Sequence, residues 1–492
     1  MPTKKKTILV IDIGTSFVKL GLFDTKANPI EGHQVKFEHW MIIKSDGTYV
    51  FNALESAEII ERGIDELVSK KNDLYEIIAV ATDTMASTIV GLDANCDPIT
   101  PVYTYADTRS FKQLSNLKRG VNQKQFYKDT GCPMHTSYIP SRLIWHKEEF
   151  PELNMKVILW TDFSNYLIRR WLKEKDVPLS YSVASWTGML DRNSLNWYKP
   201  ALDFIGVDES KFPLLRPYSD SITGLNLDFS KRWQSLNKVP FFLPVGDGAS
   251  SNIGVGCSYG NKIALSIGTT GALRVVTNSR SINIPQGLWA YKLGNDHSLL
   301  GGAFSEGGNV AAWLKRLMSI ESNSELENIL SRSKPDQHGL TVLPFLAGER
   351  AVGWAENATG TISGIRLSTT QSDIYQAFLE SVAYRFGLVA KRLLTILPGD
   401  CSVVASGGAI QSSKYWLQLI SDTLGMDVSV SNVPEDTGRG TAILALNALG
   451  ISSSFMDFDF ETSDKYQPNE KRLITYQNAM NRQEELYSKI FI

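Results

Sequence analysis

The chain has 492 residues, more than one hydrophobic core usually supports, so its length predicts two or three domains. Its 50 basic and 52 acidic side chains leave a formal net charge of −2, which argues against a nucleic-acid-binding surface. The four cysteines form no Cys-x-x-Cys pair, and no segment approaches the ~18 consecutive apolar residues of a membrane helix. We therefore expect a cytoplasmic protein without a structural zinc site, disulfides, or membrane or nucleic-acid partners.

The first predicted element is a β-hairpin over residues 7–24, in which two β-rich runs flank a short polar turn. Asp12 would end the first run, where a carboxylate between apolar walls is costly unless it is paired or bound to a metal. We expect Asp12 to hold a metal ion, although it could also cap its own turn. The turn carries Gly14, Thr15 and Ser16.

A helix is predicted next, over residues 52–70, because Asn52 and Glu55 are placed as in a capping box and apolar residues follow at helical spacing. Residues 76–81 are typical of a short buried strand, and residues 88–92 are a candidate to pair with it. Residues 108–238 are more irregular and rich in aromatic side chains. This stretch is a plausible elaboration in which a substrate pocket is shaped.

The opening pattern returns at an offset of 254 residues, with Gly268 and Thr269 in the places of Gly14 and Thr15. Ser266 falls where the first copy has Asp12. The repeat predicts two halves of related build, and we place the boundary near residue 240, between domains 1–240 and 241–492. Glycine lets a backbone approach phosphate oxygens closely and Thr adds a hydroxyl, so the two loops could hold a polyphosphate from both sides, with Lys19 as a nearby charge.

Downstream, residues 370–394 are predicted to form a long helix, and residues 402–406 a strand that ends before Gly408. A further helix is expected from about residue 412 to residue 424, closed by Gly425. Strands and helices thus alternate in both halves, which predicts an α/β fold.

Asp247 lies between two glycines after a proline-bounded apolar run. Phosphoryl transfer to an alcohol needs an in-line hydroxyl, neutralised charge and a carboxylate to accept the proton. We predict that Asp247 is this general base, while a simple Asp-Gly turn is the alternative. The chain has no Gly-x4-Gly-Lys-Ser/Thr sequence, so it is not a P-loop enzyme.

Four motifs, in this order and spacing, resemble those of the FGGY carbohydrate kinases: Asp12-x-Gly-Thr-Ser16, Gly246-Asp-Gly248, Ile267-Gly-Thr-Thr-Gly271 and Ser406-Gly-Gly408. The resemblance spans essentially the whole chain. It implies two ribonuclease-H-like domains of the actin-like ATPase and hexokinase superfamily, with ATP and Mg²⁺ bound in a central cleft. It also implies Asp247 as the base and Asp12 at the metal. The nucleotide-binding residues that it implies are Gly14, Thr15, Ser16, Lys19, Gly268, Thr269, Gly308, Gly408 and Ser412.

Within that family the chain is most similar to the gluconate kinase branch, with xylulose kinases next. The similarity is carried by Gly131-Cys-Pro-x-His135, Tyr181-Ser-x-Ala-Ser185 and Gly348-Glu-Arg-Ala351. Phosphorylation of gluconate to 6-phosphogluconate is therefore the expected reaction. A carboxylate suits the planar fork of an arginine, for which Arg109 and Arg142 are candidates, although each could instead sit in a structural ion pair. The predicted substrate residues are Thr84, Met85, Arg109 and Asp247.

Two departures keep other substrates open. Ala86 stands where the branch generally has His, and His135 could either compensate or be structural. Asp83, where relatives tend to have a small or neutral residue, would disfavour an anionic sugar unless Arg or Lys pairs with it. Xylulose or another ketopentose or polyol is therefore the alternative substrate. A homodimer, an inactive sugar-binding regulator and an Hsp70- or actin-like ATPase also remain open.

Overall fold

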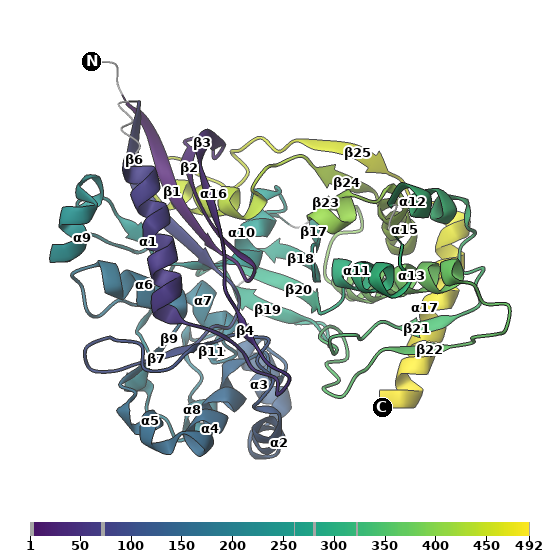
Figure 1. Cartoon of the computed structure of the whole chain (residues 1–492), viewed down its shortest axis with the longest axis horizontal. Helices are drawn as coiled ribbons and strands as arrows, with labels where there is room; N and C mark the ends of the chain where they lie inside the picture. Colours follow the sequence, from purple (N-terminus) through teal and green to yellow (C-terminus); the bar gives the residue numbers. More distant parts are fainter. Residues whose placement is uncertain (1–3, 70–73, 260, 279–281, 321–322, 492) are drawn as a thin grey trace.

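The computed structural model describes residues 4–69, 74–259, 261–278, 282–320 and 323–491. Within these residues the chain forms two α/β halves, each built on a mixed seven-stranded sheet and flanked by helices (Figure 1). This confirms the predicted α/β fold with two domains of related build.

The first sheet is centred on the predicted hairpin. Strand β1 (Lys5–Ile13) pairs antiparallel with β2 (Phe17–Asp24) and parallel with β6 (Tyr75–Thr84). The side chains of β1 from Thr7 onward are buried, which explains its continuous apolar run. The sheet is completed by β3 (Pro29–Glu38) beside β2, and by β15 (Phe241–Phe242), β14 (Ser221–Ile222) and β16 (Val245–Gly246) on the β6 side.

The second sheet repeats this core. Strand β17 (Lys262–Ile267) pairs antiparallel with β18 (Gly271–Thr277) and parallel with β23 (Ser402–Ser406), as β1 does with β2 and β6. The sequence repeat therefore corresponds to a repeated three-strand unit. The remaining strands are β20 (Ser298–Phe304) and β19 (Trp289–Lys292) on one side, and β24 (Val428–Ser431) and β25 (Thr462–Tyr466) on the other.

The helices predicted from capping residues are present, and their caps explain where they begin. Helix α1 (Ala53–Ser69) begins after Asn52, whose Oδ1 accepts the backbone N–H groups of Leu54 and Glu55 at 2.9 and 3.3 Å. Its predicted last residue, Lys70, lies outside the described residues. Helix α13 (Gln371–Leu393) begins with a capping box between Thr370 and Asp373.

The helix expected from residue 412 begins slightly later, as α15 (Lys414–Leu424), because Ser413 is its N-cap. A single turn, α14 (Gly408–Gln411), precedes it. Gly425 closes α15 in the left-handed conformation, with φ of 65°, as the sequence predicts.

One predicted strand pairing is wrong. Residues 88–92 do not pair with β6, because β1 occupies one edge of β6 while β15 and β16 occupy the other. Strand β7 (Val90–Leu92) pairs instead with β9 (Leu159–Thr161), inside the aromatic elaboration.

The helices of that elaboration are α2 (Phe111–Gly120), α3 (Gln123–Thr130), α4 (Ile139–Glu149), α5 (Pro151–Lys156), α6 (Phe163–Trp171), α7 (Tyr181–Trp186), α8 (Lys199–Ile205) and α9 (Leu227–Arg232), with 3₁₀ turns at Glu209–Lys211 and Gln234–Leu236.

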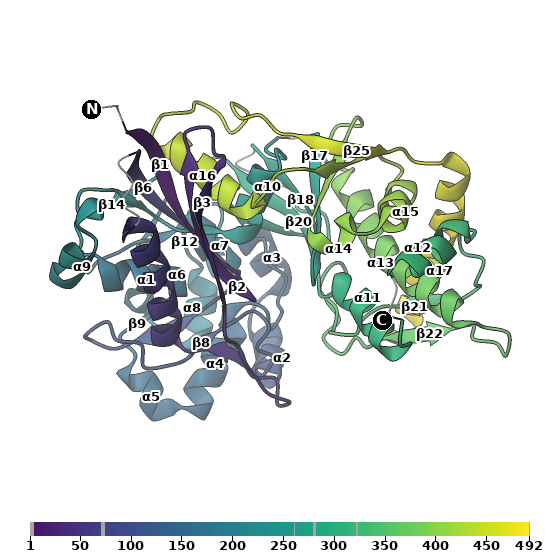
Figure 2. The same cartoon turned by 45° about the horizontal axis from the view of Figure 1, so that its top comes forward.

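Helix α10 (Asp247–Gly254) packs against α16 (Asp436–Ala448). Helix α16 also contacts β1 and β6, so a segment near the end of the chain returns to the first sheet (Figure 2). The boundary near residue 240 stays a prediction. The other elements are β4 (Ile42–Ile43), β5 (Tyr49–Phe51), β8 (Val102–Tyr103), β10 (Leu179–Ser180), β11 (Leu190–Asp191), β12 (Asn196–Trp197), β13 (Leu215–Arg216), α11 (Gly308–Leu317), α12 (Asn323–Arg332), β21 (Thr341–Leu343), β22 (Thr361–Ser363) and α17 (Glu470–Phe491).

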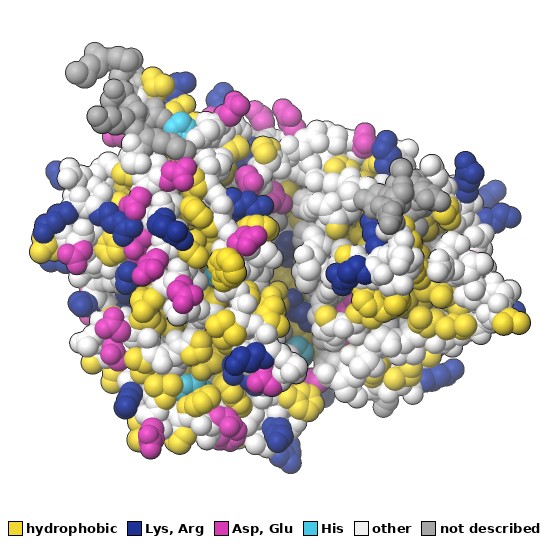
Figure 3. Space-filling view, in the orientation of Figure 1, with side chains coloured by type: hydrophobic (Ala, Val, Ile, Leu, Met, Phe, Trp, Pro, Cys, Tyr) yellow, Lys and Arg dark blue, Asp and Glu magenta, His cyan; other side chains and the backbone are white. Residues whose placement is uncertain are grey.

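The surface agrees with the near-neutral composition. On the face shown in Figure 3, acidic and basic side chains are interspersed and a groove separates the two halves. No helix within the described residues is both long and apolar enough to cross a membrane.

Candidate active site

Three neighbouring strands bring three carboxylates together. Asp12 on β1 lies directly beside Asp83 on β6, in register. Strand β16 pairs with the same end of β6, so Asp247, which follows β16, lies at the same sheet end. Asp12 is 9% exposed and Asp83 is fully buried. The chain thus gathers three carboxyl groups at one end of the first sheet.

The second half lacks the carboxyl groups that correspond to Asp12 and Asp83. On the hairpin side Asp12 faces Lys19 across the β1–β2 ladder, and Lys19 Nζ pairs with Glu435 at 2.8 Å. In the repeat, Ser266 takes the position of Asp12 and lies beside Ser406, which takes the position of Asp83. Both carboxylates of the first unit are therefore serines in the second.

Burial raises the pKa values of both Asp12 and Asp83. It raises the pKa of Asp12 to about 6, although the charge of Lys19 acts in the opposite direction. Burial and the neighbouring Asp12 raise the pKa of Asp83 well above its usual value. Asp83 Oδ2 accepts a hydrogen bond from the Thr441 hydroxyl at 2.6 Å. In the described residues no Arg or Lys forms an ion pair with Asp83, and its other oxygen has no hydrogen-bond partner.

This shift predicts a pH-dependent effect of Asp12→Asn on the stability of the free protein. Because its pKa is raised in the folded state, an ionised Asp12 lowers the free energy of unfolding. This loss is absent at pH values below the ordinary pKa of 3.8 and complete at pH values above the folded-state pKa of about 6. The variant should therefore gain stability relative to wild type as pH rises across that window, by about 1–3 kcal/mol. Urea unfolding of both proteins across the window measures the difference. A difference that does not change with pH would contradict the shift.

Asp247 is placed by a tight turn between β16 and α10. Its Oδ1 accepts the Gly248 backbone N–H at 2.7 Å. A Cβ at position 246 would lie 2.6 Å from Nε1 of Trp186, and one at position 248 would overlap the Arg274 guanidinium, so side chains from two elements close over this turn. Burial raises the pKa of Asp247, while Arg274 and Arg350 act to lower it.

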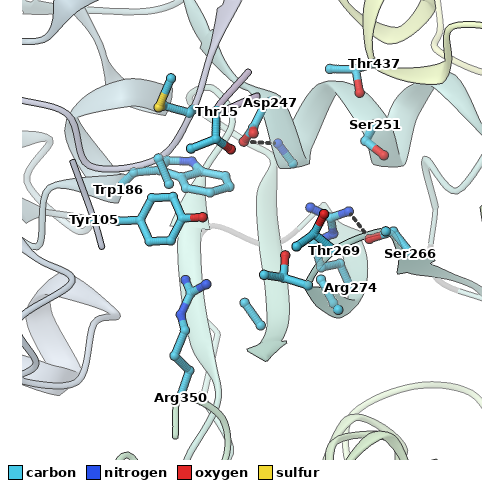
Figure 4. Close-up of a pocket in the computed structure, with 18 of the residues that line it drawn as sticks. Thr15, Tyr105, Trp186, Asp247, Ser251, Ser266, Thr269, Arg274, Arg350 and Thr437 are labelled. Carbon is cyan, nitrogen blue, oxygen red and sulfur yellow. Dashed lines mark hydrogen bonds between the residues drawn. The ribbon is translucent and has the colours of Figure 1, made fainter. Parts of the chain in front are cut away.

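Asp247 and both Gly-Thr loops face one cavity of about 250 Å³ (Figure 4). Its wall includes an aromatic stack, in which the Tyr291 ring lies 4.5 Å from Trp186 and 4.2 Å from Trp289. Flat aromatic faces of this kind suit the apolar C–H faces of a sugar. The polar residues that line the cavity are Thr15, Tyr105, Asp247, Ser251, Ser266, Thr269, Thr270, Arg274, Arg350 and Thr437.

The remaining predicted nucleotide residues lie around the second loop. The Gly308 N–H donates to the Gly268 carbonyl at 2.8 Å, and a Cβ at Gly308 would lie 2.6 Å from that of Ala409. Gly408 begins the turn α14, and the Ser412 hydroxyl donates to the Ala409 carbonyl at 2.9 Å. Gly268, Gly308 and Gly408 are therefore brought together. Ser16 instead lines a neighbouring cavity of about 590 Å³ that shares Thr15 and Thr269 with the first.

The carboxylate oxygens of Asp12 and its neighbour Asp247 are ligands of the kind that Mg²⁺ prefers. Mg²⁺ is a hard cation that binds carboxylates, phosphate oxygens and water. A second group with metal-ligand atoms, formed by Asp336, His338 and Glu380, lies elsewhere. There Arg482 donates to Asp336 at 2.6 Å and Tyr384 to Glu380 at 2.8 Å, so protein donors already satisfy the group.

The predicted substrate residues separate into two groups. Met85 and Asp247 line the cavity, as does the neighbouring Ala86, whereas Thr84 is buried and outside the cavity lining. Arg109 lies outside the cavity lining, and its guanidinium is neutralised by Asp107 at 2.6 Å.

Two further candidates are held by other contacts. Arg142 is buried and donates to the backbone carbonyls of Ser87 and Thr136. His135 lines the larger cavity, where burial lowers its pKa to about 3, and its Nδ1 accepts the Ser137 N–H.

Sequence reasoning missed the two arginines that do line the cavity. Arg274 lies on β18, three residues after the end of the second loop motif at Gly271. Arg350 lies within Gly348-Glu-Arg-Ala351, a segment that the sequence predicts to line the pocket, although Arg109 and Arg142 were the predicted cations. The available signals were the position of Arg350 inside that motif and the position of Arg274 just after the second loop motif.

The comparisons agree with this architecture. The model described as the FGGY family of carbohydrate kinases, N-terminal domain, matches residues 7–254, and the C-terminal domain model of that family matches residues 263–449. A gluconokinase of Bacillus subtilis (strain 168) is 26% identical over 462 residues, covering 91% of this chain and 88% of its own. A xylulose kinase of Staphylococcus epidermidis is 23% identical over 495 residues, covering 99% and 97%. The crystal structure of gluconate kinase from Lactobacillus acidophilus shares the fold, with a TM-score of 0.92 at 22% identity over 99% of this chain and 98% of that one.

Proposed function

Because the chain belongs to the FGGY family of carbohydrate kinases and is a sugar kinase, we propose that it transfers the γ-phosphoryl group of ATP to a terminal hydroxyl of gluconate. The observation that carries this proposal is the common cavity lined by Asp247, Thr15 and Thr269. A phosphate chain held by both loops would present its terminal group toward the base. Relatives named gluconokinase support the substrate, and relatives named xylulose kinase make xylulose the second candidate.

In this mechanism Asp247 accepts the proton of the attacking hydroxyl as the new O–P bond forms. Burial raises the pKa of this carboxylate, which makes it a better proton acceptor, while Arg274 and Arg350 act against the rise. The loop hydroxyls and backbone N–H groups orient the phosphate oxygens. Mg²⁺, held by Asp12, would neutralise phosphate charge. Closure of the groove would exclude water, whose attack on ATP is the competing reaction.

The proposal is tested by a coupled ADP-release screen over gluconate, xylulose, ribulose, fuculose, rhamnulose, erythritol and glycerol. We expect sugar-dependent ADP release with the highest kcat/KM for gluconate. Sugar-independent hydrolysis would favour an ATPase, and tight sugar binding without any turnover would favour an inactive regulator.

Gly268→Ala separates phosphate binding from folding. A Cβ at this position meets no atom within 4 Å and points into open space beside the cavity. The variant should keep the wild-type Tm but raise the KM for ATP by about tenfold, which corresponds to about 1.4 kcal/mol of lost binding. Initial-rate kinetics at saturating sugar measures the change. An unaltered KM for ATP would show that this loop does not approach the phosphates.

A further inference from the structure

The Arg350 side chain is partly buried, and no described residue provides its guanidinium with an ion pair or a hydrogen bond. Its Nε is buried without a partner, and its guanidinium lies over the Tyr105 ring at 5.3 Å. Arg350 lines both the 250 Å³ cavity and the 590 Å³ cavity, so it stands at their junction. A buried donor of this strength is costly to leave unpaired, which points to an anionic ligand.

The nearest acids do not neutralise Arg350. The adjacent Glu349 pairs with Arg385 and accepts the Tyr487 hydroxyl at 2.6 Å. Glu306 is buried and forms no ion pair with Arg350, and burial raises its pKa to about 8, which disfavours its charged form. Among the described residues that line the smaller cavity, Asp247 is the one carboxylate, and it is not paired with Arg350.

The second cavity arginine has a different position. Arg274 donates to the Ser266 hydroxyl at 2.9 Å and lies against the Asp247 turn, where the phosphoryl group would arrive. Arg350 enters from the opposite side of the cavity and points toward Tyr105 (Figure 4). A linear sugar with its terminal hydroxyl at Asp247 would therefore extend its other end toward Arg350.

We propose that Arg350 binds the carboxylate of the substrate and thereby selects sugar acids over neutral sugars of the same length. This inference rests on the proposed function, since it assumes that the sugar's reacting end lies at Asp247. The planar guanidinium presents two parallel N–H donors that match a carboxylate, which an alcohol group cannot exploit. The partly buried position at the groove shields the pair from water and strengthens it.

The test compares gluconate with glucitol, in which a hydroxymethyl group replaces the carboxylate. The ratio of their kcat/KM values is measured for wild type, Arg350→Gln and Arg350→Lys. Arg366→Gln is the matched control, because Arg366 is exposed and outside both cavities. Losing a charge-assisted hydrogen-bonded pair should lower the ratio by about 10- to 150-fold in Arg350→Gln. The ratio for Arg350→Lys should lie between those of wild type and Arg350→Gln, and the ratio for the Arg366→Gln control should match that of wild type.

Because both substrates share the reacting end, the ratio cancels any general loss of activity, and a Tm measurement confirms folding. An unchanged ratio in a folded, active Arg350→Gln variant overturns the inference and leaves the kinase function standing. A wild type that prefers glucitol, or that phosphorylates a neutral sugar of the panel but not gluconate, does the same. A wild type that neither phosphorylates nor binds, by calorimetry, any sugar of the panel overturns both.

Discussion

Asp247→Asn is expected to lower kcat by about 10²- to 10⁴-fold, the usual contribution of a general base. The substitution keeps the shape of the side chain and the hydrogen bond from Gly248 to its oxygen. It removes the basic carboxylate that faces the common cavity of the two loops. Because burial raises the pKa of Asp247, the neutral amide should be tolerated without loss of stability. Steady-state ADP release measures kcat, and calorimetry with ADP measures nucleotide binding, which should persist.

The matched control is Asp203→Asn, which removes an exposed carboxylate from a surface pair with Lys199. Such pairs contribute little, so both activity and Tm should remain at wild-type values. If Asp247→Asn turned over at the wild-type rate with the best sugar, another group would have to accept the proton.

Gly440→Ala is expected to destabilise the protein by about 3 kcal/mol, the largest stability effect that we predict for a single methyl group. Helices α10 and α16 cross with their backbones in contact. A Cβ at position 440 would lie 2.6 Å from the Ser250 carbonyl carbon and 2.8 Å from the Gly254 nitrogen. Backbone atoms cannot rotate away as a side chain can, so the helices must separate. Equilibrium unfolding in urea measures the loss.

The same separation should impair catalysis, since α10 carries Asp247 and Thr441 of α16 bonds to Asp83. Gly399→Ala is the matched control, because its Cβ meets no atom within 4 Å and its backbone does not have positive φ. That variant should lie within about 0.5 kcal/mol of wild type. Equal stability of the two alanine variants would show that the helix crossing tolerates separation.

Local signals predicted much of the fold. The repeated run-turn-run pattern predicted β1–β2 and β17–β18, and caps at Asn52 and Thr370 predicted where two helices begin. These features depend on residues close in sequence. The partner of β7 could not be predicted in this way, because it depends on which distant strands pair with the two edges of β6.

The candidate site shows the same limit. The motifs singled out Asp12, Asp247 and the Gly-Thr loops. The fold brings Asp12 and Asp247, which are 235 residues apart in sequence, to one end of the first sheet, and Asp247 shares its cavity with Thr15 and Thr269. The choice of arginine required the tertiary structure. Arg109 has an acid two residues away that neutralises it, whereas Arg350 follows an acid that Arg385 already binds. Which cation stays available is decided by contacts between distant segments.

In the proposed reaction, a phosphoryl group moves from ATP to the terminal hydroxyl of a sugar beside Asp247. The most direct measurement is phosphorus NMR of the products formed by wild type and Asp247→Asn from MgATP and the best sugar of the panel. We expect wild type to form ADP and a terminal sugar phosphate in equal amounts, and Asp247→Asn to form almost none of either. Release of inorganic phosphate in place of a sugar phosphate, or an equal yield of sugar phosphate from Asp247→Asn, would contradict the proposed reaction.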